Sequence, residues 1–99
     1  MVIADLTYIE SIDKIEHYLE AHRAFLDKYY KKGIFILSGR KSPRTGGMII
    51  SNLSTVSEME KIIQEDPFFK HGLAVYRCIQ LEPTRYADGI EKYLGDHYA

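Results

Sequence analysis

The feature that most constrains the fold of this chain is a change in the period of its apolar residues. In residues 1–9 the β-branched and other apolar residues are closely spaced, as in a strand. From Ser11 to Gly33 they recur at steps of three, four and seven, which is the period of an amphipathic helix. Strand-like apolar runs follow at 34–39, 48–53 and 73–81, with a second helical pattern between the last two. The predicted order is β-α-β-β-α-β.

Capping residues mark the ends of both predicted helices. Ser11 is a suitable N-cap for one long helix, which should end where Lys31 and Lys32 are followed by Gly33. The segment from Thr55 to Glu58 fits the S/T-x-x-E capping box and predicts the start of the second helix. That helix should end before Pro67, because the residue before a proline disfavours the helical conformation.

This order predicts an α+β, ferredoxin-like fold, a four-stranded antiparallel sheet with both helices on one face. The 99 residues should form one domain, residues 1–99, whose C-terminal tail over 84–99 has a pattern compatible with a terminal helical turn. The run 34–39 is apolar enough to be buried on both faces. Because a chain this short has a small core and one sheet face is left bare, we expect a homodimer that packs sheet on sheet.

Composition excludes several classes of protein. Thirteen Lys and Arg against fourteen Asp and Glu lack the basic excess expected of a nucleic-acid binder. The apolar runs fall short of the roughly 20 residues of a membrane span, and the N-terminal segment has no basic region typical of a signal peptide. A single cysteine, Cys78, permits neither an internal disulfide nor a cysteine-based metal cluster. We therefore expect a cytoplasmic protein that binds neither nucleic acid nor membrane.

His22 is the first candidate for chemistry. On the long helix it lies seven residues from Ile15 and four from Leu26, which places it on the apolar stripe. His17 lies roughly 140° away and should face solvent. Since helical metal ligands need i, i+4 spacing, these two histidines do not predict a metal site. His22 is either a core histidine with satisfied nitrogens or a base that faces a cavity.

Asp66 is the second candidate. With Pro67 after it, it fits the N-cap of a short helical turn, which is a purely structural role. In the predicted topology this turn lies on the same side of the sheet as the first helix. The carboxylate could therefore reach His22 and hold its tautomer, leaving the other nitrogen free as a base.

The predicted hairpin supplies the candidate substrate-binding residues. Ser38 and Gly39 end one strand, and a loop with Arg44 leads to Gly47 at the start of the next. A guanidinium presented from a glycine-rich turn can clamp a carboxylate or phosphate, although a solvated loop would have the same composition.

Five stretches resemble the YciI-like (YCII-related) family. They are Ala21–Asp27, Gly33–Gly39, Pro43–Gly47, Asp66–Phe68 and Gly72–Tyr76. The resemblance implies a ferredoxin-like domain of the dimeric α+β barrel type, with an active site built on a His–Asp dyad. By motif, those two roles fall on His22 and Asp66, and the Arg44 loop would border the same pocket. The chain departs from the family at Arg40, where proline usually follows Ser-Gly.

Two functions remain open at this point. The first is a cofactor-independent enzyme for proton transfer or elimination on a small anionic or aromatic metabolite, with His22 as general acid or base and Asp66 orienting it. The alternative is a non-catalytic ligand-binding or regulatory dimer that uses the same pocket. Neither hypothesis requires a cofactor or a metal.

Overall fold

A computed structural model describes residues 1–95 of the chain, and residues 96–99 lie outside the described part. The elements in chain order are β1 Val2–Tyr8, α1 Ile12–His17, α2 Leu19–Lys31, β2 Phe35–Arg40, β3 Gly46–Ser51, α3 Val56–Ile63, α4 Pro67–Lys70, β4 Ala74–Gln80 and the 3₁₀ turn η1 Ile90–Lys92. None of the helices in the described residues has the length and apolarity needed to cross a bilayer.

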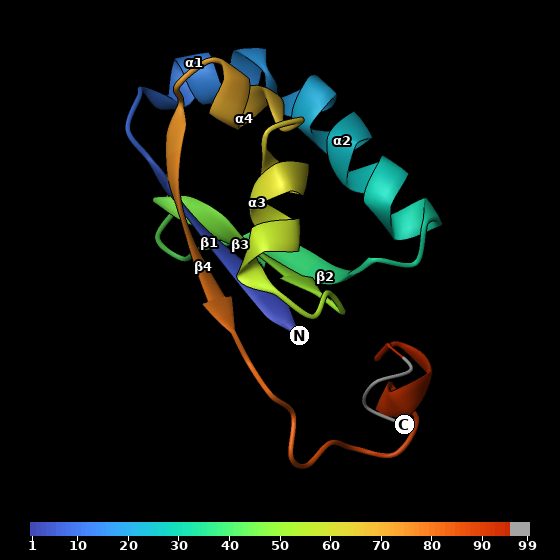
Figure 1. Ribbon diagram of the computed structural model, residues 1–99. Helices are drawn as coiled ribbons and strands as arrows, with labels where there is room; N and C mark the ends of the chain where they lie inside the picture. The colour runs from blue at the N-terminus through green and yellow to red at the C-terminus, as the bar shows by residue number, and fades with distance from the viewer. Residues whose placement is uncertain (96–99) are drawn as a thin grey trace.

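The strands form one antiparallel sheet in the order β2-β3-β1-β4. The helices α1 to α4 lie together on one side of this sheet (Figure 1). The predicted α+β, ferredoxin-like fold is thereby confirmed. Both crossings bring a helix back over the same face, so residues from α2, α4 and the β2–β3 hairpin can converge at one end of the molecule.

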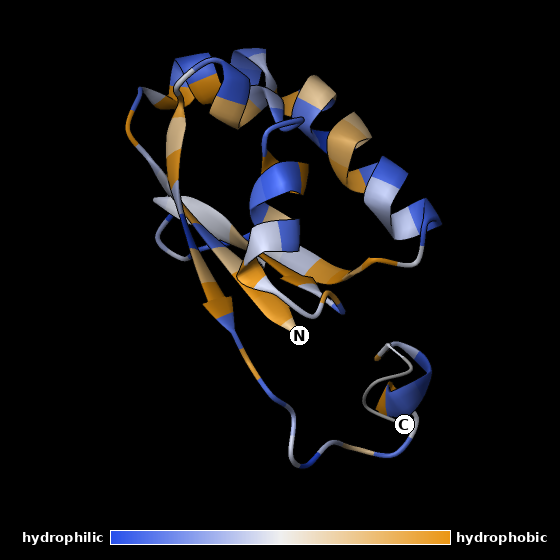
Figure 2. Ribbon diagram, viewed as in Figure 1, coloured by the Kyte–Doolittle hydropathy of each residue, from blue (hydrophilic) through white to orange (hydrophobic). Residues whose placement is uncertain are grey.

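The core lies between the helices and the inner face of the sheet. Alternate residues of β1, namely Val2, Ala4 and Leu6, are buried on this inner face. The helices cover them with apolar residues at helical spacing, and Figure 2 shows hydrophobic and hydrophilic bands alternating along α2 and α3. The helical residues buried in this core are Ile15, Phe25, Tyr29, Met59, Ile63 and Phe68.

The outer face of the sheet carries a continuous apolar row. The strand register aligns Leu37 with Ile50, Ile50 with Ile3, and Ile3 with Ile79. Leu37 is 54% exposed and Ile79 38% exposed. The single chain does not bury segment 34–39 on both faces, as its apolar run would allow, because the helices cover one face alone and β2 buries Phe35 but not Leu37. We call these four residues the outer row.

The prediction of one long helix is wrong at one point. The helix is interrupted at Tyr18, which has φ −104° and ψ 6° and separates α1 from α2. The ring of Tyr18 stacks on His71, at the C-cap of α4, with 4.1 Å between ring centroids. We attribute the interruption to this packing, since no glycine or proline lies near. The predicted ends are confirmed, with Ser11 as N-cap and Gly33 at φ 73° after α2.

The second helical segment begins and ends as predicted. Thr55 and Glu58 form a reciprocal capping box at the start of α3. Asp66 is the N-cap of α4, and Pro67 is its first residue. The start of α4 places Asp66 opposite α2, where its carboxylate contacts His22.

The C-terminal segment folds back against the edge of the domain as far as it is described. The side-chain amide of Asn52 donates to the carbonyl groups of Gly33 and Tyr93, and Leu94 is buried. The helical turn expected within 84–99 corresponds to η1. The last four residues of that prediction lie outside the described residues.

Candidate functional site

His22 lies on α2 with its imidazole between a buried carboxylate and an open pocket. Its Nδ1 is 2.8 Å from Oδ1 of Asp66, and its side chain is 12% exposed. The ring stacks on Phe68 with 4.1 Å between centroids and 7° between planes. The other nitrogen, Nε2, makes no hydrogen bond within residues 1–95, and His22 lines the pocket. One nitrogen is therefore anchored and the other is available to a ligand.

Asp66 is wholly buried and serves two roles at once. Its Oδ1 accepts hydrogen bonds from His22 and from the backbone N–H of Phe68, the latter at 3.0 Å. Its Oδ2 accepts the hydroxyl of Tyr76 at 2.5 Å. Both interpretations of Asp66 from the sequence, helix cap and histidine partner, therefore describe real contacts. Three donors satisfy this buried carboxylate, as a charge removed from water requires.

Tyr76 strengthens this arrangement from β4. Burial, together with the negative charge of Asp66, raises the pKa of the Tyr76 phenol far above its ordinary value. The phenol therefore remains a proton donor at any physiological pH. The oxygens of an ionised carboxylate can only accept, so Nδ1 of His22 is the donor in this pair, and in the corresponding neutral tautomer Nε2 carries the lone pair.

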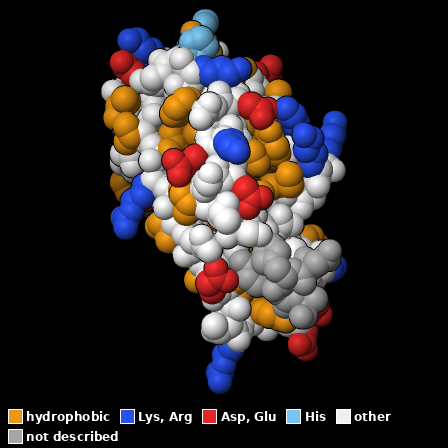
Figure 3. Space-filling view, viewed as in Figure 1, with side chains coloured by type: hydrophobic (Ala, Val, Ile, Leu, Met, Phe, Trp, Pro, Cys, Tyr) orange, Lys and Arg blue, Asp and Glu red, His pale blue; other side chains and the backbone are white. Residues whose placement is uncertain are grey.

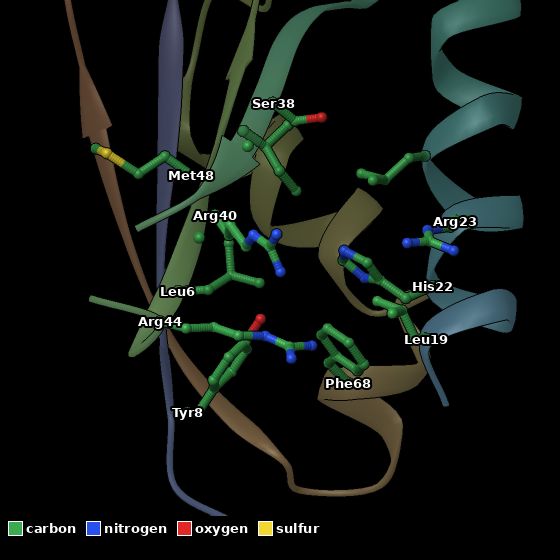
Figure 4. A pocket seen from close by; sticks show the side chains of 14 residues that line it. Leu6, Tyr8, Leu19, His22, Arg23, Ser38, Arg40, Arg44, Met48 and Phe68 are labelled. Atoms are coloured by element: carbon green, nitrogen blue, oxygen red, sulfur yellow. The ribbon is translucent and has the colours of Figure 1, made fainter. Parts of the chain in front are cut away.

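The pocket itself has a volume of about 400 Å³ and is bounded by α2, the β2–β3 hairpin and β1. Apolar residues form much of its wall, including Leu6, Leu19 and Phe68 (Figure 4). This size and mixture of apolar and polar lining are typical of sites for small organic molecules.

The structure places five of the six residues predicted from the sequence on the pocket wall. These five are His22, Ser38, Gly39, Arg44 and Gly47. Asp66 lies behind His22 and does not line the pocket. The strands are longer than the predicted runs 34–39 and 48–53 at the hairpin, since β2 extends to Arg40 and β3 begins at Gly46.

Three arginines give the pocket its charge. Arg44 donates from Nη1 to Glu16 at 3.0 Å, and this hydrogen bond raises the pKa of its guanidinium. Its Nε is buried with no hydrogen-bond partner among the described residues. Arg23, from α2, and Arg40, from β2, also line the pocket (Figure 4) and have no ion pair within residues 1–95.

Sequence reasoning missed Tyr76 and Arg23 as site residues. The two-residue alternation of β4 could have placed Tyr76 on the helix-facing side of the sheet, with Ala74 and Cys78. Arg23 follows His22 directly, but adjacent helical residues differ by roughly 100° in direction, so the sequence did not indicate that both reach one cavity.

Metal-binding groups are not assembled in the described part of the chain, where no cluster of three or more His, Cys, Asp or Glu is present. Cys78 is half-buried, and burial raises the pKa of its thiol, which therefore stays protonated near neutral pH. On the face seen in Figure 3, acidic and basic side chains are interspersed rather than gathered into a basic patch.

The family model for the YCII-related domain matches residues 2–82. The chain belongs to the YCII-related family. This YCII-related protein matches no curated protein. Among solved structures it is similar to 5-chloro-2-hydroxyhydroquinone dehydrochlorinase from Burkholderia phenoliruptrix AC1100, in complex with 2,5-dihydroxybenzoquinone, at 19% identity and a TM-score of 0.68. The alignment covers 83% of this chain and 94% of the dehydrochlorinase. At that identity the likeness shows a shared fold.

Proposed function

We propose that this protein is a cofactor-independent acid–base catalyst that transfers a proton in, or eliminates a leaving group from, a small anionic or aromatic metabolite. The proposal rests on the different environments of the two His22 nitrogens. Nδ1 is held by the buried Asp66, while Nε2 has no partner within residues 1–95 and its ring lines the pocket. An imidazole with one nitrogen held by a carboxylate and the other facing a cavity has the geometry of a general base.

In the proposed reaction, Nε2 of His22 removes a proton from a carbon or hydroxyl group of the substrate. The electron pair left behind either remains as an enolate or expels a leaving group from the neighbouring carbon. Asp66 stabilises the imidazolium that forms, and a guanidinium such as that of Arg44 binds the anionic group of the substrate. The proton then returns to the product or is released to water, which restores the neutral imidazole.

Two further observations support this chemistry. Phe68 stacks on His22 and lines the pocket, so the reacting group would meet an apolar wall that excludes water. The dehydrochlorinase that shares the fold acts, by its name, on a chlorinated hydroxyhydroquinone. Loss of chloride after proton removal is a reaction of the proposed class.

The test is incorporation of solvent deuterium, or loss of a leaving group, followed by proton NMR on a panel of small carboxylates and hydroxylated aromatics. We expect the wild type to act on at least one member and His22→Asn to be slower by about 10²–10⁴-fold. His17→Asn is the matched control, because His17 is exposed on α1 and does not line the pocket.

A thermal-shift screen on the same panel separates catalysis from the alternative of a ligand-binding or regulatory dimer. Compounds that stabilise wild type and His22→Ala equally, with no turnover by either, would favour the binding protein. Turnover that His22→Asn retains in full would refute the proposed base.

The setting we propose is a homodimer in the cytoplasm. The outer row, in which Leu37 and Ile79 are exposed and Ile50 and Ile3 partly buried, supports a second copy packed on the bare sheet face. The lone thiol of Cys78 suits a reducing compartment.

A further inference from the structure

We infer that the pocket selects small organic dianions, with Arg23 and Arg40 as the residues that determine this specificity. The inference rests on the proposed function for the location of the site, but it concerns binding and not the proton transfer. It starts from the charges of the pocket wall, which among residues 1–95 is lined by three arginines and by no Asp or Glu.

One of the three guanidinium groups already has a partner. Arg44 is paired with Glu16, a residue of α1 that lies outside the pocket lining. The buried carboxylate of Asp66 also lies outside the lining, and its oxygens accept from His22, Phe68 and Tyr76. Two positive charges, those of Arg23 and Arg40, are therefore left without a partner in the described residues.

These two guanidinium groups come from opposite walls. Arg23 belongs to α2 and Arg40 to β2, and in Figure 4 their side chains lie on either side of His22. A ligand with a single anionic group can engage one wall alone. A ligand with two anionic groups can engage both, and its carbon skeleton would then span the space in front of His22.

The remaining lining favours an organic ligand over an inorganic anion. Leu19 and Leu26 of α2 with Phe68 of α4 on the helix side, and Leu6 of β1 on the sheet side, offer apolar surface between the charges. A volume of about 400 Å³ has room for a small ring or chain that bears two carboxylates, or a carboxylate and a phenolate. Inorganic phosphate would leave this apolar surface in contact with water.

The test compares ligands that differ by one charge. Isothermal titration calorimetry is carried out with terephthalate, its monomethyl ester and inorganic phosphate at low ionic strength. We expect the diacid to bind wild type at least about tenfold more tightly than the monoester, the scale of one charge-assisted contact. This preference should shrink when salt is raised, because the guanidinium groups are partly exposed to solvent.

Substitutions test whether Arg23 and Arg40 cause the preference for the diacid over the monoester. Arg23→Gln and Arg40→Gln should each reduce the advantage of the diacid to within about threefold, since each removes one of the two anchoring charges. Lys31→Gln is the matched control, because Lys31 is an exposed cation on the same helix that does not line the pocket. Thermal unfolding of each variant verifies that the fold is retained.

The outcomes separate this inference from the proposed function. Three results would overturn the inference. The monoester or phosphate could bind as tightly as the diacid, the preference could be unchanged in both arginine variants, or the diacid could fail to bind. His22→Asn should keep the dianion preference while losing turnover. If wild type prefers dianions but catalyses no proton transfer on any of them, the proposed function fails and the inference stands. If it catalyses proton transfer on monoanions and dianions alike, the inference fails and the function stands.

Discussion

At the scale of single residues, Asp66 links the candidate site to the stability of the folded protein. Its carboxylate is completely buried and accepts from the imidazole of His22, the backbone of Phe68 and the hydroxyl of Tyr76. A buried charge is tolerated when its hydrogen bonds are complete, and each missing donor leaves part of the desolvation cost uncompensated. The orientation of His22 therefore depends on groups that never touch a ligand in the pocket.

Tyr76→Phe tests this dependence. The change leaves Oδ2 of Asp66 without its donor and should lower the free energy of unfolding by about 1.5–3 kcal/mol at neutral pH, the range for hydrogen bonds to charged groups. Urea unfolding followed by circular dichroism measures the loss. A variant as stable as wild type would show that the phenol does not support the carboxylate.

The Tyr76→Phe variant should also change how the free energy of unfolding depends on pH in the alkaline range. Burial raises the pKa of Tyr76 above the value of 10.0 expected in the unfolded chain. Its contribution is therefore complete below pH 10 and is lost as the pH rises further, by up to about 1.4 kcal/mol per pH unit. Tyr76→Phe should unfold with a shallower dependence on pH above 10. Tyr86→Phe, which changes an exposed ring, should keep the dependence of wild type.

The sequence allowed the His22 and Asp66 pair to be predicted because each residue follows a local rule. His22 lies on an apolar helical stripe and Asp66 precedes a proline at a helix start, and the topology places both on one side of the sheet. Tyr76 and Arg23 could not be assigned in the same way. Their contacts depend on side-chain direction and on the distance between α2 and the hairpin, which are set by packing.

At the scale of the elements, strand β3 runs very close to β1 at Gly46, next to Gly47 and Leu6 of the pocket wall. A Cβ atom on Gly46 would lie 1.9 Å from the carbonyl oxygen of Leu6, which is backbone and cannot rotate away. Only glycine permits β3 to run this close to β1 at the start of the strand. The lack of a side chain at Gly46 therefore allows the hairpin that carries Arg40 and Arg44 to pack against the central strand β1.

Gly46→Ala should destabilise the protein by about 2–4 kcal/mol, because the two strands must separate to admit the methyl group. Gly39→Ala is the control on the neighbouring strand, since a Cβ there meets nothing within 4 Å. Its effect should stay within about 0.5 kcal/mol, as for most surface substitutions. Thermal and urea unfolding compare the two. Equal losses would show that the approach of β3 to β1 is not the cause.

Element boundaries followed closely from the sequence wherever a cap decided them, as at Ser11, Thr55 and Asp66. The interruption at Tyr18 did not, because its ring packs on His71, a residue far along the chain. The exposure of Leu37 was missed for a related reason. An apolar strand does not reveal from its own residues which of its faces will be covered.

For the whole molecule, the bare sheet face determines the expected assembly. The outer row crosses all four strands, and its end members Leu37 and Ile79 are substantially exposed. A domain of this size gains much from burying such a surface against a second copy.

Ile79→Lys should therefore shift the protein from dimer to monomer, because a lysine buried against the second copy would be unpaired. Size-exclusion chromatography with light scattering at micromolar concentration measures the mass. Ala24→Lys, on the exposed side of α2, should remain dimeric. A wild type that is monomeric at all concentrations would contradict the proposed homodimer.

The double role of Asp66 has a consequence for how sequence variation in this protein would be interpreted. Because one carboxylate both caps α4 and orients His22, losing it removes folded molecules and active molecules together. Losing the imidazole removes one of the three donors to this carboxylate and, under the proposed function, the base itself, so activity should fall further than abundance. Cellular protein level and metabolic output should therefore fall in parallel for changes at position 66, whereas for changes at position 22 the metabolic output should fall further than the protein level.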